Sequence, residues 1–183
     1  MNDVKEIAEI KNWVESFVVE MNLCPFAKRE LINNRVRFVA SNSSTREELL
    51  GALQDELVQL ETDSGTETTI LVHANVLQDF QDYNDFLDVA DQLLIEMNFE
   101  GVYQIASFHP DYQFAGTTPD APENYTNRSP YPMLHLLREA SLERAVAAYS
   151  DVDEIPVRNI ELMNRMGQAK LSEMFNKVKN SEA

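Results

Sequence analysis

The sequence contains a single cysteine, Cys24, among its 183 residues. One cysteine cannot form an intramolecular disulfide or a thiolate zinc cluster, so neither is expected to hold this chain together. No apolar run approaches the length that spans a bilayer, and the N-terminal residues lack the basic and apolar segments of a secretory signal. We therefore expect a cytoplasmic protein that does not enter a membrane.

Positive charge is scarce, because 15 Lys and Arg face 31 Asp and Glu and leave a net charge of -16 at pH 7. Residues 41 to 101 hold 14 acidic residues and one basic residue, Arg46. Such an acidic segment repels phosphate backbones, so nucleic acid is not an expected partner. The simplest interpretation of the run is a solvated helix face that keeps the protein soluble.

Internal repeats and low-complexity segments are also missing. With 44% hydrophobic and 25% charged residues, five Gly and seven Pro, the composition is that of an ordinary globular protein. A chain of this length is long enough to bury a core without disulfides or a structural metal. We predict one α/β domain over residues 1–183.

The spacing of apolar residues predicts helices and strands in alternation. The expected helices cover residues 3–22, 26–33, 44–62 and 80–97, and Asp3 with Glu6 could form a capping box at the first of them. The expected strands cover residues 36–40, 69–73 and 102–108. Strands separated by helices imply parallel pairing through right-handed crossovers.

The last third of the sequence predicts a long loop followed by helices. We expect a loop of roughly twenty residues, a helix over residues 129–149 and another over residues 153–178, on which Gly167 could permit close approach of a neighbour. Both helices are expected to cover the sheet. The fold class is therefore α/β, with a small parallel or mixed sheet of three to four strands, and residues 112–114 are a candidate edge strand.

Polar residues gather where the predicted strands end. His73 follows the second strand, and His109 and Asp111 follow the third. Ligands of open parallel sheets bind beyond the carboxyl ends of the strands, and long loops are commonly functional. We therefore predict a polar site centred on residues 107–138, in which His73, His109 and Arg128 surround one cleft that Cys24 could reach.

Three motifs in this sequence occur together in a known family. They are LCPFA at residues 23–27, FHP at residues 108–110, and TNRSPYP at residues 126–132 followed by HLLRE at residues 135–139. In this combination the chain resembles, over nearly its whole length, the uncharacterised family catalogued as domain of unknown function 1415. That family has no established activity, so the resemblance implies no reaction and only indicates which positions to test.

The candidate catalytic residues are Cys24, His109 and His135. Cys24 opens a short predicted helix, where backbone N–H groups and the helix dipole could lower the pKa of its thiol. The alternative is an inert core cysteine. The histidines could move protons or, with His73 and Asp111, coordinate a metal. Their spacing matches no metal motif, so we expect no metal, and the sequence indicates no particular cofactor.

Two arginines in an acidic protein suggest an anion site. Arg128 precedes Ser129 and Pro130, which suit the start of a helix with free backbone N–H groups. His135 and Arg138 would share one face of that helix. The alternative is a structural arginine that ties the loop to a carboxylate such as Asp111 or Asp120. The predicted ligand-binding residues are His73, Asp111, Asn127, Arg128, Ser129 and Arg138.

Two functions remain open on this evidence. The first is an enzyme or binding protein for a small anionic metabolite at the polar 107–138 site. The second is a non-catalytic module that docks on another protein through the aromatic loop, with Tyr112, Phe114, Tyr125 and Tyr131. A deep pocket would favour the first function, and a flat aromatic patch would favour the second.

Overall fold

A computed structural model describes residues 2–149 and 152–180 of the chain. The strands are β1 (Val36–Ala40), β2 (Thr68–Val72), β3 (Tyr103–Phe108) and β4 (Met133–Arg138). The helices are α1 (Asn2–Trp13), α2 (Ala27–Ile32), α3 (Arg46–Thr62), α4 (Phe80–Glu96), α5 (Glu139–Ala147), α6 (Glu154–Met166) and α7 (Gln168–Asn180). A π-helical segment η1 (Val14–Val19) continues α1, and η2 (Pro122–Thr126) is a short 3-10 helix.

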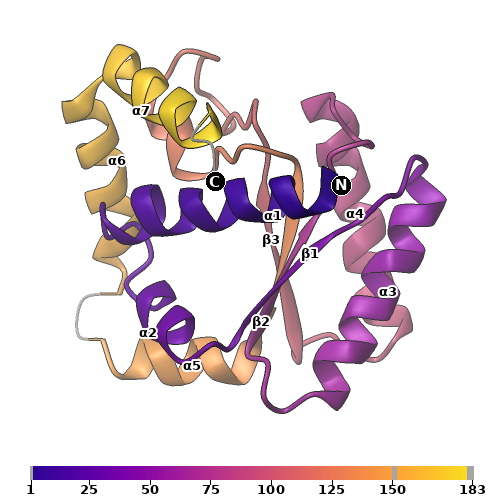
Figure 1. Ribbon diagram of the computed structural model, residues 1–183. Helices are drawn as coiled ribbons and strands as arrows, with labels where there is room; N and C mark the ends of the chain where they lie inside the picture. The colour runs from indigo at the N-terminus through magenta and orange to yellow at the C-terminus, as the bar shows by residue number, and fades with distance from the viewer. Residues whose placement is uncertain (1, 150–151, 181–183) are drawn as a thin grey trace.

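The four strands form one mixed sheet in the order β1-β2-β4-β3. β1 and β2 pair in parallel, as two strands joined by a helix are expected to do. β4 lies between β2 and β3 and is antiparallel to both, so β2 and β3 run in the same direction without pairing. The predicted α/β class with a small mixed sheet is confirmed (Figure 1).

Strand β4 corrects the prediction of a helix over residues 129–149. The run from Met133 to Leu137 is mostly apolar, and periodicity alone does not separate a buried strand from a buried helix in so short a run. The run forms the interior strand because the sheet supplies backbone partners on both of its edges. Only α5 is helical there, and residues 112–114, the candidate edge strand, lie in the loop.

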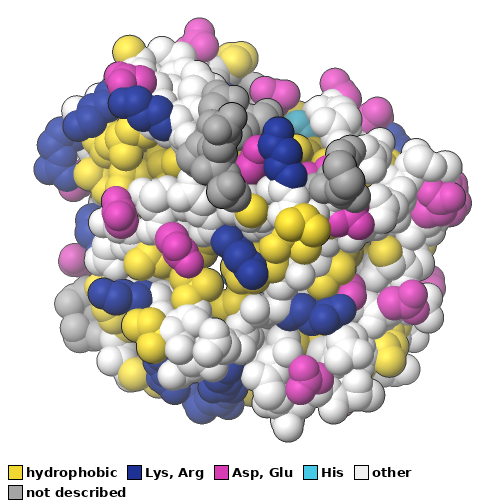
Figure 2. Space-filling view, in the orientation of Figure 1, with side chains coloured by type: hydrophobic (Ala, Val, Ile, Leu, Met, Phe, Trp, Pro, Cys, Tyr) yellow, Lys and Arg dark blue, Asp and Glu magenta, His cyan; other side chains and the backbone are white. Residues whose placement is uncertain are grey.

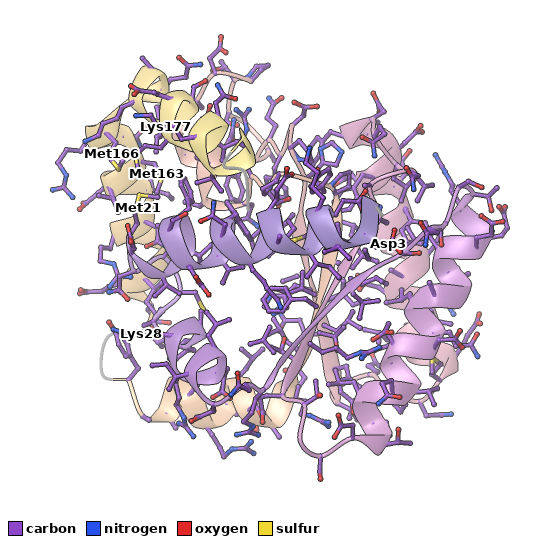
Figure 3. All side chains as sticks on the ribbon, in the orientation of Figure 1. Asp3, Met21, Lys28, Met163, Met166 and Lys177 are labelled. Atoms are coloured by element: carbon purple, nitrogen blue, oxygen red, sulfur yellow. The ribbon has the colours of Figure 1, made fainter. Side chains whose placement is uncertain are left out.

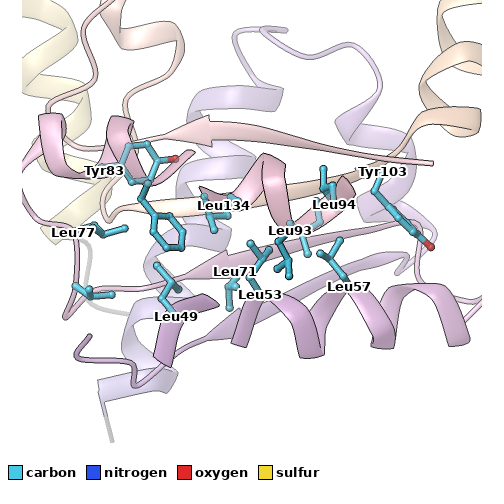
Figure 4. Close-up of a cluster of buried hydrophobic side chains, with 14 of the residues drawn as sticks. Leu49, Leu53, Leu57, Leu71, Leu77, Tyr83, Leu93, Leu94, Tyr103 and Leu134 are labelled. Atoms are coloured by element: carbon cyan, nitrogen blue, oxygen red, sulfur yellow. The ribbon is translucent and has the colours of Figure 1, made fainter. Parts of the chain in front are cut away.

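Helices α3 and α4 cover one face of the sheet (Figure 1). Thr45 and Glu48 form a capping box that begins α3, and the Asp79 carboxylate caps α4 by accepting from Gln81 and Asp82 N–H groups. The first core cluster fills the space between these helices and the sheet (Figure 4). Its fully buried leucines are Leu49, Leu53, Leu57, Leu60, Leu71, Leu134 and Leu136, each worth roughly 1.5–3 kcal/mol of burial.

The opposite face of the sheet is covered by α1, η1, α2 and α5 (Figure 1). Asp3 lies inside the first turn of α1 and its carboxylate accepts from Asn42 Nδ2, so it is not the predicted N-cap residue. Of the described helices, none is both long and apolar enough to cross a membrane.

Helices α6 and α7 form an outer layer that packs mainly on η2, α1 and η1. Met21, Met163 and Met166 lie together where α6 meets the end of η1 (Figure 3). The predicted single helix over residues 153–178 is wrong, because Gly167 adopts a positive φ of 77° and ends α6. No neighbouring side chain approaches Gly167 closely, so its role is conformational.

Candidate functional site

Alternate side chains of β4 face opposite sides of the sheet, as the two-residue period of a strand requires. Met133, His135 and Leu137 face α1, α2 and α5, whereas Leu134 and Leu136 belong to the core under α3 and α4. His135 and Arg138 are three residues apart and therefore lie on opposite faces. The predicted shared helix face of these two residues is wrong.

A cavity of about 290 Å³ lies between the sheet and the helices α1, α2 and α5. Its lining is mostly apolar and includes Val14 and Val18 of η1. Ala106 on β3 is the register partner of His135, and its small side chain leaves room beside the imidazole. On this side of the molecule, hydrophobic side chains reach the surface between α1 and α2, with Lys and Arg side chains around them (Figure 2).

His135 is held in one tautomer by two neighbouring groups. The Thr68 hydroxyl lies 2.6 Å from His135 Nε2 and 2.6 Å from the Leu136 carbonyl oxygen. A carbonyl only accepts, so the hydroxyl donates to it and accepts from Nε2–H. Nδ1 then carries a lone pair that meets no donor within the described chain. Burial lowers the pKa of His135 from 6.5 to about 4, so the ring is neutral at pH 7.

Three further residues of the cavity wall each have a buried polar atom without a hydrogen-bond partner, and the sequence analysis missed all of them. Trp13 Nε1, Glu30 Oε2 and Glu67 Oε1 are buried atoms for which residues 2–149 and 152–180 supply no hydrogen-bond partner. Trp13 is 2% exposed and Glu67 is 8% exposed. Glu30 Oε2 and Glu67 Oε1 are in ion pairs with Arg35 at 3.6 Å and Arg144 at 3.7 Å, so Trp13 Nε1 is the atom of this set that has neither a hydrogen-bond partner nor an ion pair.

Cys24 lines the same cavity, at the turn that precedes α2. Burial raises the pKa of its thiol above the usual 9.0, and hydrogen bonds from the Phe26 and Ala27 backbone only partly oppose this. This direction favours the alternative of an inert core cysteine, because removal from water penalises the thiolate more than the short helix stabilises it. The thiol is protonated at neutral pH.

His73 and His109 follow β2 and β3 and meet on the α4 side of the sheet, outside the cavity. Both are fully buried against Tyr83, whose ring centroid lies 5.8 Å from that of His73 and 5.1 Å from that of His109. They were expected at the same end of the sheet, and this is confirmed. They border no cleft, because neither ring reaches solvent.

The hydrogen bonds of these two histidines hold the loop between β2 and α4. His73 Nδ1 donates to the Val76 carbonyl at 3.1 Å, and His109 Nε2 donates to the Leu77 carbonyl at 3.2 Å. His109 Nδ1 accepts from the Asp111 N–H. Leu77 has a φ of 57°, which costs a residue with a side chain roughly 1–2 kcal/mol. The hydrogen bonds from the two histidines to this loop offset part of this cost.

Arg128, the residue predicted to bind an anion, is also bonded to other groups of the loop. Arg128 donates to the carbonyls of Tyr112 and Pro119 and stacks over the Tyr125 ring at 4.7 Å. The Ser129 hydroxyl donates to the Tyr131 carbonyl, and no helix begins at Ser129. The anion site at a helix N-terminus is therefore wrong. The structural alternative holds for Arg128, with carbonyls in place of the expected carboxylates.

The remaining loop residues follow the same pattern. Asn127 Nδ2 donates to the Ser107 carbonyl, and Asp111 is exposed with only its backbone N–H engaged, to His109. The polar side chains of residues 107–132 thus satisfy the backbone of an irregular segment. None of the four aromatic residues proposed for docking is exposed, so they do not form a flat surface patch; they are Tyr112, Phe114, Tyr125 and Tyr131.

Arg138 touches the cavity, but its guanidinium is directed to the other face. It donates to the carbonyls of Leu60, Asp63 and Thr66 and to the Tyr103 hydroxyl. These carbonyls belong to the end of α3 and the turn that follows it, where helices leave acceptors unpaired. Most N–H groups of Arg138 are therefore engaged by this turn and by Tyr103.

Metal binding receives no support from the described residues, because no three His, Cys, Asp or Glu side chains among them are grouped as a metal site requires. Of the predicted site residues, Cys24, His135 and Arg138 line the cavity. The other predicted residues are spread over the loop and the far face of the sheet.

Comparison with known proteins assigns the chain to a family. No curated protein and no solved structure matches it. The model of one family, described as protein of unknown function (DUF1415), matches residues 5–173. Because this match covers most of the chain, including Cys24 and His135, the chain belongs to the DUF1415 family.

Proposed function

We propose that the chain binds a small organic molecule of largely apolar character in the cavity between the sheet and α1, α2 and α5. Ligand sites are typically concave, mostly apolar and equipped with a few placed polar groups. The cavity, at about 290 Å³, has this character. It is smaller than most drug-sized sites, which favours a ligand of modest size.

The observation that carries the proposal is the unpaired Nδ1 of His135. His135 is half-buried and lines the cavity, and its Nδ1 is open to a molecule bound there. Thr68 and the Leu136 carbonyl pair Nε2 and leave Nδ1 as an acceptor. A hydrogen-bond donor on a bound molecule would satisfy it.

The π-helical segment supports the same location. π-Helical turns are rare and occur frequently at functional sites. Here η1 begins directly after Trp13, and both Val14 and Val18 line the cavity. The wider turn shapes the wall that faces the ligand.

Binding is favoured over nucleophilic catalysis by the charge states of the two reactive side chains. Burial raises the pKa of the Cys24 thiol and lowers that of His135, so both groups are neutral near pH 7. A thiolate, not a thiol, is the nucleophile of cysteine enzymes. The anion site at the 107–138 loop is less favoured, because carbonyl groups of the loop engage Arg128 and Ser129. The docking function is less favoured, because none of the four aromatic residues is exposed.

The proposal is tested by a substitution on α5 that places a larger side chain in the cavity. Ala145→Leu adds three carbons on the face of α5 that lines the cavity, and Ala147→Leu adds them at an exposed position of the same helix. Trp13 is the single tryptophan and lines the cavity, so its fluorescence reports binding. The probe is 4-phenylbutanol, a neutral molecule with an apolar body.

We expect the probe to change Trp13 fluorescence in the wild type and in Ala147→Leu, and to have no effect on Ala145→Leu. Calorimetry of the same proteins checks that the optical change reflects binding. If Ala145→Leu binds the probe as tightly as the wild type, the probe binds outside this cavity. A wild type that binds nothing would refute the proposed function.

A further inference from the structure

We infer that the ligand of this cavity is an uncharged secondary alcohol, whose hydroxyl group has hydrocarbon on both sides and donates to His135 Nδ1. The inference rests on the proposed function and adds the chemical class of the ligand. It follows from which polar atoms of the wall a bound molecule can reach, and from where the reachable acceptor lies along the strand.

The charged side chains of the wall do not select a charged ligand. Glu30 and Glu67 both form ion pairs with Arg35, and their oxygens without a hydrogen-bond partner are buried atoms. Arg138 directs its guanidinium to the turn after α3, on the other face of the sheet. The lining that a ligand meets is mostly apolar, and a charge buried there without a partner would be costly.

His135 Nδ1 is an acceptor that a bound molecule can reach. The ring is half-buried on the cavity wall, and the Thr68 hydroxyl already pairs with its Nε2. Trp13 Nε1 also lacks a hydrogen-bond partner, but it is a buried atom. A ligand therefore gains most by supplying one hydrogen-bond donor, and a hydroxyl group supplies it without charge.

Two further polar side chains of the wall are already engaged. The Ser141 hydroxyl accepts from Arg144 at 2.7 Å. The Cys24 sulfur accepts from the backbone N–H groups of Phe26 and Ala27, and a thiol is only a weak donor. The imidazole is therefore the group that orients the ligand.

The imidazole lies at the middle of the cavity wall and not at one of its ends. Met133, His135 and Leu137 line the cavity in succession along β4. At about 3.3 Å per residue, each of the two flanking residues is roughly 7 Å from His135 along the strand. A molecule that extends along β4 thus meets the acceptor near the middle of its own length.

The wall is apolar on both sides of this acceptor. On one side Phe108, the register partner of Met133, packs edge to face on Trp13 with ring centroids 5.7 Å apart. On the other side Leu142 and Ala145 line the cavity from α5, the helix that directly follows β4. A terminal hydroxyl bound to Nδ1 would leave one of these sides empty, whereas an internal hydroxyl lets hydrocarbon fill both.

The test compares three probes that share one carbon skeleton. In 1-phenylbutan-2-ol the hydroxyl lies within the chain, and in 4-phenylbutanol it lies at the end. In 1-phenylbutan-2-one a carbonyl that cannot donate replaces the internal hydroxyl. Binding is followed by Trp13 fluorescence and calorimetry. We expect the internal alcohol to bind roughly three- to tenfold tighter than either of the others, as one neutral hydrogen bond would give.

Two variants locate the preference. His135→Phe keeps a flat ring and removes the acceptor, so the internal alcohol should bind no more tightly than the ketone. Ser141→Ala is the matched control, because Ser141 carries a hydroxyl on the α5 side of the same wall. It should leave the order of the three affinities as in the wild type. If Ser141→Ala abolishes the preference and His135→Phe does not, the ligand hydroxyl lies against α5 and the inference is wrong.

The outcomes separate this inference from the proposed function. If the wild type binds the terminal alcohol as tightly as the internal one, or the ketone more tightly, the binding cavity stands and the secondary alcohol is overturned. If the wild type binds none of the three probes, both are overturned. The wild-type comparison decides the ligand class even if His135→Phe does not fold.

Discussion

The three histidines differ in how many ring nitrogens find a partner, and this separates their roles. His109 is satisfied at both nitrogens by the Asp111 N–H and the Leu77 carbonyl. His73 and His135 are each satisfied at one nitrogen. Nε2 of His73 is enclosed by the core with no partner in the described chain, whereas His135 faces a cavity. Access to a ligand, not residue type, makes His135 the functional candidate.

The buried imidazole of His73 should make the protein sensitive to mild acid. Burial lowers its pKa to about 4, while the unfolded chain has the ordinary value of 6.5. Between these values the unfolded chain binds a proton that the folded chain excludes. The stabilising effect of the neutral ring is therefore fully present above pH 6.5 and is lost as the pH falls toward 4.

His73→Asn tests this, since the amide can still donate to the Val76 carbonyl but does not titrate. Urea unfolding at neutral pH and at about pH 5 should show that the wild type loses roughly 1–2 kcal/mol more than the variant over this interval. The quantity compared is the change in the free energy of unfolding with pH. The absolute free energies are not compared, because the variant is also less well packed. Parallel pH profiles would contradict the prediction.

Among the elements, the break between α6 and α7 depends on one residue. Gly167 has a φ of 77°, and a Cβ added there would meet no atom within 4 Å. Gly167→Ala should therefore destabilise the protein by about 1 kcal/mol or more through backbone strain alone. Chemical denaturation gives the free energy of unfolding.

Gly51 is the matched control because it lies inside α3, is exposed and also has open space around it. Gly51→Ala should stabilise the protein by about 0.5–1 kcal/mol, since alanine is the better helix former. Changes of the same sign in both variants would mean that factors other than backbone conformation dominate at one of the two positions.

For the whole molecule, the sheet separates the acidic helices from the cavity. The acidic segment of residues 41 to 101 contains α3 and α4, which cover one face, while the cavity lies on the other. Burial and the neighbouring Asp88 raise the pKa of Asp91 on α4. Like charges crowded on one side oppose folding at low ionic strength.

Asp88→Asn should relieve part of this repulsion and stabilise the protein by a few tenths of a kcal/mol in low salt. The gain should vanish in about 1 M salt, where the Debye length is about 3 Å. Asp82→Asn is the contrasting variant, because Asp82 accepts a 2.6 Å ion pair from Arg46 and should gain nothing. Thermal unfolding across a salt series measures both. A gain for Asp88→Asn that does not depend on salt would exclude electrostatics as its cause.

Much of the element pattern could be predicted because it is local. The leucines of α3 recur at helical spacing behind a Thr45 capping box, and the β-branched run of β2 lies between two turns. Prediction failed at residues 133–138, because a short apolar run fits either a strand or a helix. It also failed at Gly167, because the helical spacing of apolar residues continues past this position and does not indicate its positive φ.

The candidate site was predicted only in part for a related reason. Cys24 and His135 were selected as reactive residue types, and both line the cavity. Trp13, Glu30 and Glu67 were missed, because nothing in the sequence marks which of many acidic or aromatic residues will lack a partner. Arg128 and Ser129 were selected for their chemistry, and the loop backbone engages both.

By itself, the sequence determined the α/β class, most helix and strand positions, and three residues of the cavity, since these depend on periodicity, capping and residue chemistry. The tertiary structure decided that residues 133–138 form the interior strand and that His135 and Arg138 face opposite sides. It also decided which polar atoms remain unpaired around the cavity. Pairing is a property of three-dimensional neighbours, so the sequence does not show which buried polar atoms lack a hydrogen-bond partner.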